Sequence, residues 1–299
     1  MKLKSTLGYS YIIFLIIYSG FVLLPRPAQA TLSRYHLSVT GLRLLDLTIV
    51  ILVAGIWYAG FYGYSRLKGY VDVIRDYKDG EHMARISQGL LWLALWLPVS
   101  STSSTVLNYY ALKHTSLAST TAIINNYVSL FFPLVAFILI SLGSRGLGQL
   151  ARLKPKFSTV QILIILLIYV GVVYLHLVAT TPNRAAIYHM SIWFILTTIV
   201  APYMYMWGTG AYATYQLFLY QRKVAGVVYR RSWDLLAFGL GWLVIASVGL
   251  QYLTTLTSHL QSLSIYGILA VVYALLLVLS IGFILVAAGT RKLKAMEEV

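Results

Sequence analysis

Long apolar segments joined by short basic loops constrain this chain more than any other feature of its sequence. Seven of these segments cover residues 45–64, 87–110, 117–142, 158–178, 190–219, 234–256 and 264–289. Each has about the 17–25 residues, or more, that an α-helix needs to cross the hydrocarbon core of a bilayer. Lipid offers the backbone no hydrogen-bond partners, and a helix satisfies its own backbone. The sequence therefore predicts an all-α, polytopic membrane helix bundle with seven transmembrane helices.

Residues 1–30 have the pattern of a secretory signal peptide. Lys2 and Lys4 precede an apolar stretch, and Ala28-Gln29-Ala30 supplies a small-x-small cleavage site. The alternative is an uncleaved first membrane helix, because the apolar stretch is long for a signal peptide; the bundle would then have eight helices. In both cases we expect residue 31 to lie outside, and residues 31–299 to form a single transmembrane domain.

The basic residues set the orientation, because Lys and Arg near helix ends favour the cytoplasmic side. With residue 31 outside, 18 of the 23 basic residues fall on the inner side, and the outer side receives only Arg26, Arg34, Arg43, Lys113 and Arg184. We expect a multi-pass protein of the plasma membrane with its mature N-terminus outside and its C-terminus cytoplasmic. The formal charge of +15 belongs to these loops, so it predicts no nucleic-acid partner.

The bundle lacks the residues that most membrane chemistries require. No Asp, Glu, Lys or Arg lies in the middle of any of the seven segments, and the chain has no cysteine. A retinal Schiff base would need a lysine in the last segment, and none lies between residues 265 and 289. The six histidines show no metal-ligand spacing, and no Gly-x-Ser-x-Gly element is present. We therefore expect no catalytic residue, no metal and no cofactor, and do not expect an enzyme.

Uncharged polar residues gather in the outer halves of three segments. Such groups need a partner or water inside hydrocarbon, so they predict either hydrogen bonds between helices or a ligand pocket. Asn125 and Asn126 are adjacent and point about 100° apart on a helix. One is expected to face Asn108 or the hydroxyl-rich stretch of the second segment, and the other needs a further helix or water. The candidate ligand-binding residues are Ser101, Thr105, Asn108, Asn125, Asn126, Thr198, Tyr205 and Tyr212.

Two prolines near midplane, Pro98 and Pro202, interrupt the second and fifth segments. Interrupted helices in corresponding halves point to transporter binding sites. Counting segments one to three against four to six as an inverted pair places these two helices in corresponding positions, although the sequence shows no internal similarity between the halves. Small residues spaced by four, such as Gly55, Ala59 and Gly63, predict close helix packing inside the bundle, with a dimer seam as the alternative.

Two functions fit these features. The first is a permease or facilitator for a neutral small molecule that forms hydrogen bonds. The second is a seven-helix sensor, or an assembly subunit that acts through cytoplasmic partners or other membrane subunits. The lipid bilayer is an expected partner in both. The prolines beside polar stretches favour transport.

Overall fold

The computed structural model describes residues 2–23, 39–113, 118–151, 193, 201–224, 227–256 and 265–297. These residues form seven main helices: α1 (Lys2–Leu23), α3 (Val39–Val73), α4 (Gly80–Lys113), α5 (Ala118–Leu150), α8 (Ala201–Val224), α9 (Val227–Leu256) and α10 (Ile265–Glu297). No strand occurs in these ranges, so the predicted all-α class is confirmed for them. The apolar segment predicted at residues 158–178 lies outside the described residues.

Among the residues that the structure describes, three spans are long and apolar enough to cross a membrane: Asp46–Val73, Gly80–Leu107 and Tyr127–Leu150, in α3, α4 and α5. The longest helix, α3, has 35 residues. At about 1.5 Å per residue it is ~50 Å long, whereas the hydrocarbon core is ~30 Å thick. A multi-pass membrane protein is compatible with these helices, and the count of seven crossings stays a prediction.

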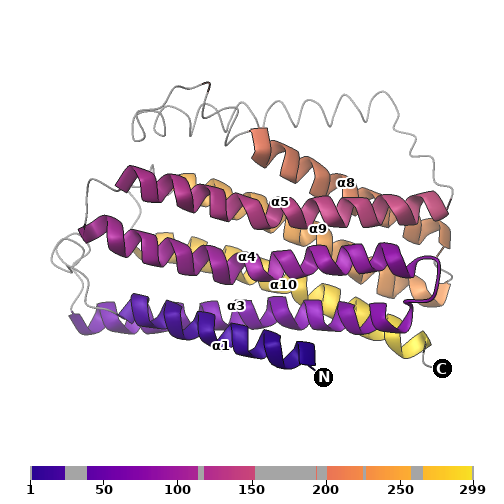
Figure 1. Ribbon diagram of the computed structural model, residues 1–299, viewed down its shortest axis with the longest axis horizontal. Helices are drawn as coiled ribbons and strands as arrows, with labels where there is room; N and C mark the ends of the chain where they lie inside the picture. The colour runs from indigo at the N-terminus through magenta and orange to yellow at the C-terminus, as the bar shows by residue number, and fades with distance from the viewer. Residues whose placement is uncertain are drawn as a thin grey trace.

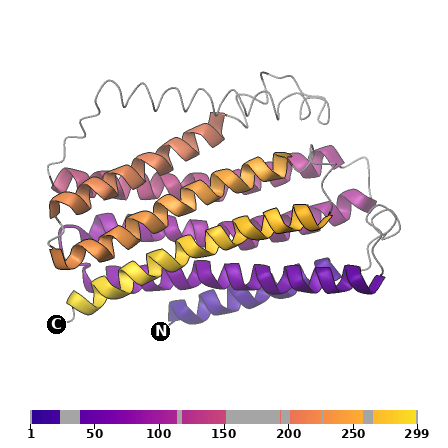
Figure 2. The ribbon, with the colours of Figure 1, turned by 180° about the vertical axis from the view of Figure 1, so that it is seen from behind.

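Six helices close into a ring. α3 packs on α4, α4 on α5, α5 on α8, α8 on α9, α9 on α10, and α10 returns to α3. The views from the two sides show α3, α4 and α5 in one layer and α10, α9 and α8 in the other (Figures 1 and 2). Along the bundle, α3, α5, α8 and α10 run in one direction and α4 and α9 in the opposite direction.

Helix α1 lies outside this ring, against α3 and α4. The Tyr11 hydroxyl donates a hydrogen bond to the Ala54 carbonyl oxygen at 2.9 Å. The rings of Tyr18 and Trp57 meet edge to face with their centroids 5.4 Å apart, and Val22 is buried. The apolar stretch of the predicted signal peptide thus packs as a helix in this structure, and cleavage after Ala30 remains a prediction.

Two glycines bring α4 and α5 into close contact. A Cβ atom on Gly89 would lie 2.6 Å from the carbonyl oxygen of Ala136, and one on Gly143 would lie 2.5 Å from that of His82. Real Cβ contacts essentially never fall below 3.0 Å. Only glycine therefore allows the two backbones to approach this closely.

The pair α9 and α10 repeats these contacts. A Cβ on Gly239 would lie 2.8 Å from the Gly282 carbonyl oxygen, and one on Gly289 would lie 2.6 Å from that of Ser232. The α9 residues stand 150 positions after their equivalents in α4, and the α10 residues 146 positions after theirs in α5. We call residues related in this way counterparts.

The contacts that join the two layers also correspond. Gly60 of α3 faces Ala94 of α4 and Phe283 of α10. Its counterpart in α8, Gly210, faces Val244 and Phe137, which are the counterparts of those two residues. The α3–α10 and α5–α8 seams are therefore equivalent, and the ring has the contacts of a two-fold arrangement along the bundle. Gly63 also closes on Phe283, which confirms internal packing at this small residue, whereas a Cβ on Gly55 would meet nothing within 4 Å, so the predicted close packing was wrong there.

The sequence carries the same relation. Counterparts with identical residues are Trp57 and Trp207, Gly60 and Gly210, Leu67 and Leu217, Gly89 and Gly239, Leu90 and Leu240, Trp92 and Trp242, Leu93 and Leu243, Phe137 and Phe283, Ile138 and Ile284, Leu139 and Leu285, Gly143 and Gly289, Arg145 and Arg291. The expected inverted pairing of segments one to three with four to six was wrong, and so was the expectation that the chain has no internal sequence similarity. The similarity relates segments one to three with five to seven and skips residues 158–178.

Candidate functional site

A hydroxyl-rich stretch, residues 100–105, follows Pro98 in α4. One face of it meets α5. The hydroxyl oxygens of Ser100 and Ser129 lie 2.8 Å apart, and the Ser103 hydroxyl donates to Oδ1 of Asn125 at 3.4 Å. The predicted contact between an asparagine and this stretch is confirmed for Asn125, and it joins two helices.

Two candidate residues of the same stretch bond to their own helix. The Ser101 hydroxyl donates to the Leu97 carbonyl oxygen, and the Thr105 hydroxyl donates to the Ser101 carbonyl oxygen at 2.8 Å. A hydroxyl that donates in this way still has lone pairs that accept hydrogen bonds. Ser101 and Thr105 therefore offer acceptors to a neighbour or a solute.

Two of the buried polar atoms of α4 that have no partner among the residues that the structure describes lie close to Pro98 in the sequence. They are the hydroxyl oxygen of Thr102 and the indole nitrogen of Trp96. Thr102 is 8% exposed and Trp96 is 4% exposed. A buried polar group without a hydrogen bond costs roughly 1–3 kcal/mol. This part of α4 therefore has hydrogen-bonding capacity that water, a solute or the rest of the chain would satisfy.

The tyrosines of α8 lie elsewhere. Tyr205 is 59% exposed and Tyr212 is 37% exposed in the described structure, whereas Tyr203 and Met206 are buried. The inward face of α8 is the one that carries Gly210 at the α5 seam. The structure therefore does not bring Tyr205 and Tyr212 together with the hydroxyls of α4. The side chains of Asn108 and Asn126, and Thr198, lie outside what the structure describes.

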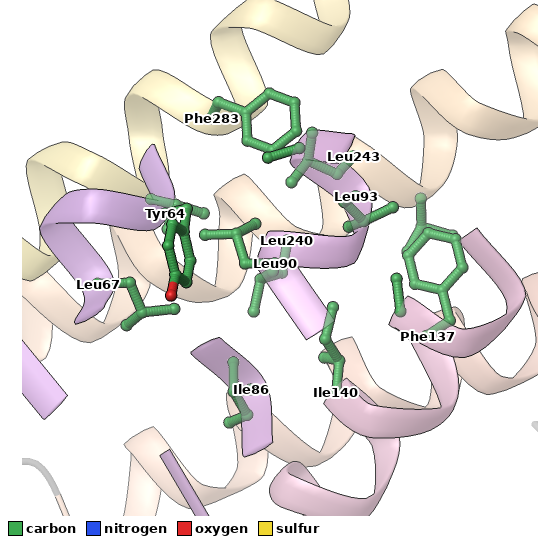
Figure 3. Packing of buried hydrophobic residues seen from close by; sticks show 14 of the residues in the cluster. Tyr64, Leu67, Ile86, Leu90, Leu93, Phe137, Ile140, Leu240, Leu243 and Phe283 are labelled. Atoms are coloured by element: carbon green, nitrogen blue, oxygen red, sulfur yellow. The ribbon is translucent and has the colours of Figure 1, made fainter. Parts of the chain in front are cut away.

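A cluster of buried apolar side chains, which we call the apolar core, fills the bundle next to the polar stretch. It is built largely from counterparts: Leu90, Leu93, Phe137, Leu240, Leu243 and Phe283 (Figure 3). All of them are at most 2% exposed. Sequence reasoning missed the apolar core because its residues are ordinary apolar ones. The constant spacing between identical counterparts is the signal that would have found it.

One face of α4 changes from apolar to polar residues beyond the apolar core. Leu90, Leu93 and Leu97 follow one another at helical spacing, and Ser101 and Ser104 continue that spacing. We call these five positions the inward stripe of α4. The stripe is apolar where it belongs to the apolar core, and it is polar toward the end of α4 that is predicted to lie outside.

A second polar contact lies at the opposite end of the helix bundle. The Gln221 side-chain nitrogen donates to the Asp234 carboxylate, which joins α8 to α9. Gln221 is buried, and its side-chain oxygen has no partner in the described residues. Their counterparts in α3 and α4 are Val71 and Ala84, so this contact belongs to one layer only.

Within the described ranges, no group of three or more His, Cys, Asp or Glu side chains could hold a metal ion. Comparison of the chain with protein-family models, curated proteins and solved structures gives no match. The argument for function therefore rests on this chain's own residues.

Proposed function

We propose that this protein is a permease or facilitator for a neutral small molecule that forms hydrogen bonds. The observation that carries the proposal is the equivalence of the two layers, in which the α3–α10 and α5–α8 seams make matching contacts. Many transporters are built from two repeats, and their substrates bind near midplane where the repeats meet. Two equivalent layers with an apolar centre fit that design.

The polar groups support a neutral solute. The outer part of α4 offers hydroxyls, and α5 offers the Asn125 amide. A charged solute inside the bilayer would need a counter-charge, because a bare charge there costs at least ~2.5–3.5 kcal/mol. The middles of the apolar segments contain no Asp, Glu, Lys or Arg.

The experiment is solute entry into liposomes that contain the purified chain. Urea, glycerol and a hexose serve as neutral probes, and light scattering follows swelling after an osmotic step. We expect entry of at least one probe to exceed that into protein-free liposomes. A second measurement is labelling of Ser104→Cys by a membrane-impermeant thiosulfonate, because a solute route must admit water. Entry equal to that of empty liposomes for all three probes, together with an unreactive Ser104→Cys, would refute the proposal.

The inner helix ends favour a second candidate function, that of a sensor or assembly subunit. α3 and α5 extend beyond a ~30 Å hydrocarbon core, and Arg66 and Arg145 are exposed near their ends. Such ends suit contact with anionic lipid or a cytoplasmic protein. Replacing both arginines with glutamine separates the two functions: a permease keeps its solute entry, whereas a subunit loses its partner on co-purification.

A further inference from the structure

The sequence similarity between the two layers extends beyond the six helices of the ring. The pattern Ile-Tyr-x-Gly-x-Val-x-Leu occupies residues 17–24 and again residues 168–175. The first copy lies mainly in α1 and the second in the segment predicted to cross the membrane at residues 158–178. The separation of 151 residues is close to the 150 that relates α3 to α8.

Two further matches follow at similar separations. Tyr-His-x-Ser occurs at residues 35–38 and 188–191, and Thr-Ile-Val occurs at residues 48–50 and 198–200. Matches therefore run in the same order from residue 17 to the end of α5 and from residue 168 to the end of α10. A repeat of about half the chain accounts for all of them.

We propose that the chain consists of two tandem copies of one four-helix membrane unit, and that the solute site is shared between them. In this proposal residues 2–23 are retained as the first helix of the first unit, which replaces the cleavage after Ala30 expected from the sequence, and residues 158–178 are the sequence counterpart of these residues. A unit with four crossings starts and ends on the same side of the membrane. Both units therefore have the same orientation, as the parallel course of α3 and α8 requires (Figure 1).

The repeat assigns the second wall of the site, and this part of the inference rests on the proposed function. The counterparts of Leu90 and Leu93 are Leu240 and Leu243, and the same spacing continues along α9 to Ser247, Gln251 and Thr254. α9 therefore also turns from apolar to hydrogen-bonding residue types, one helical turn earlier than the inward stripe of α4, because Ser247 is the counterpart of Leu97. Only uncharged donors and acceptors occupy these positions, so the ligand class is a neutral polyhydroxyl or amide solute.

The pattern of differences between counterpart residues supports this assignment. Several counterparts that build the helix contacts are identical, such as Gly89 and Gly239 or Phe137 and Phe283, because a larger residue at these glycines would part the helices. At the outer positions the residues differ, as in Ser101 against Gln251 and Ser104 against Thr254, yet all four are residue types that can donate and accept hydrogen bonds. Packing alone would accept apolar residues at these positions, so we infer that hydrogen bonding to a shared ligand maintains their polarity.

The first experiment tests the four-helix unit on the full chain. Intact mass of protein purified from its own host should include residues 1–30. In this cysteine-free chain, Ser38→Cys and Ser191→Cys should both react with an impermeant thiol reagent on intact cells, and Ser5→Cys should react only after the membrane is opened. A mass that lacks residues 1–30, or labelling of Ser38→Cys and Ser191→Cys from opposite sides, would overturn the proposal.

The second experiment tests the shared site. Ser104→Cys and Thr254→Cys should react from outside with a small membrane-impermeant thiosulfonate, and urea or glycerol should slow both reactions alike if that probe is a ligand. Ile245→Cys is the matched control; it is 63% exposed on the outer surface of α9, where lipid excludes the reagent. If Ser104→Cys reacts and Thr254→Cys does not react even without solute, the shared site is overturned and the proposed permease stands. If neither cysteine reacts without solute, both proposals are overturned.

Discussion

Replacing Gly89 with alanine tests the close contact of α4 and α5. The added Cβ would lie 2.6 Å from the Ala136 carbonyl oxygen, where ordinary contacts begin at 3.4 Å. The helices would have to part by about 0.8 Å, and a gap of that size forfeits a quarter to a half of each dispersion contact across it. We expect a loss of about 1–3 kcal/mol of unfolding free energy, the usual cost of overpacking a buried contact.

The counterpart supplies the sharper half of this test. Gly239→Ala would place its Cβ 2.8 Å from the Gly282 carbonyl oxygen, so it should destabilise by a similar amount. Gly55→Ala and Gly208→Ala are the matched controls, because a Cβ at either position meets nothing within 4 Å. Without a clash, alanine should stabilise a helix by about 0.5–1 kcal/mol.

The assay is SDS titration of the detergent-solubilised chain, followed by tryptophan fluorescence, with all four variants measured side by side. The expected order places Gly55→Ala and Gly208→Ala at or above the unmodified chain and the other two well below it. The reasoning fails if Gly89→Ala is as stable as Gly55→Ala. It also fails if Gly89→Ala and Gly239→Ala differ by more than the whole expected effect.

Three further outcomes follow from the described contacts and the predicted topology. Asn125→Leu removes the acceptor for Ser103 and should lower stability by about 0.6–2 kcal/mol in the same titration; no change would show that this bond contributes nothing. Asn126→Gln should alter solute entry into liposomes while the unfolding midpoint stays fixed, and a fixed entry rate would exclude it from the site. Lys113→Cys and Lys154→Cys should be labelled from opposite sides of the membrane, and labelling from one side would refute the topology.

The helical class followed from hydropathy because a chain in lipid must satisfy its backbone internally. The link between α4 and α5 was also accessible, since adjacent asparagines beside a hydroxyl-rich helix have few other partners. Asn125 meets that expectation through Ser103. These are local arguments, and they need no knowledge of which helices are neighbours.

The sequence could not predict in the same way which face of a helix points into the bundle. The spacing of Tyr205 and Tyr212 places them on one stripe of α8, and the structure exposes that stripe. In a soluble protein the polar face identifies solvent, but lipid is as apolar as the bundle interior. Apolar periodicity therefore cannot tell the inside of this bundle from its outside.

The repeat was missed for a related reason. Several of its identical residues lie at helix contacts, such as Gly89 and Gly239, and most of the residues between them differ. Similarity spread at three- and four-residue spacing is weak in a linear comparison, and a comparison that starts from the wrong pairing of segments loses it altogether. The three-dimensional contacts supplied the pairing.

Cross-linking at the two seams tests the equivalence of the layers most directly. A Cβ on Gly63 lies 3.3 Å from that of Phe283, close to the ~3.5–4.5 Å of a disulfide. Oxidation in membranes should therefore join Gly63→Cys to Phe283→Cys, and also their counterparts Ala213→Cys and Phe137→Cys. The mismatched pair of Gly63→Cys with Phe137→Cys should stay reduced. Cross-linking at one seam only, or in the mismatched pair, would contradict the two-fold arrangement on which the proposed function rests.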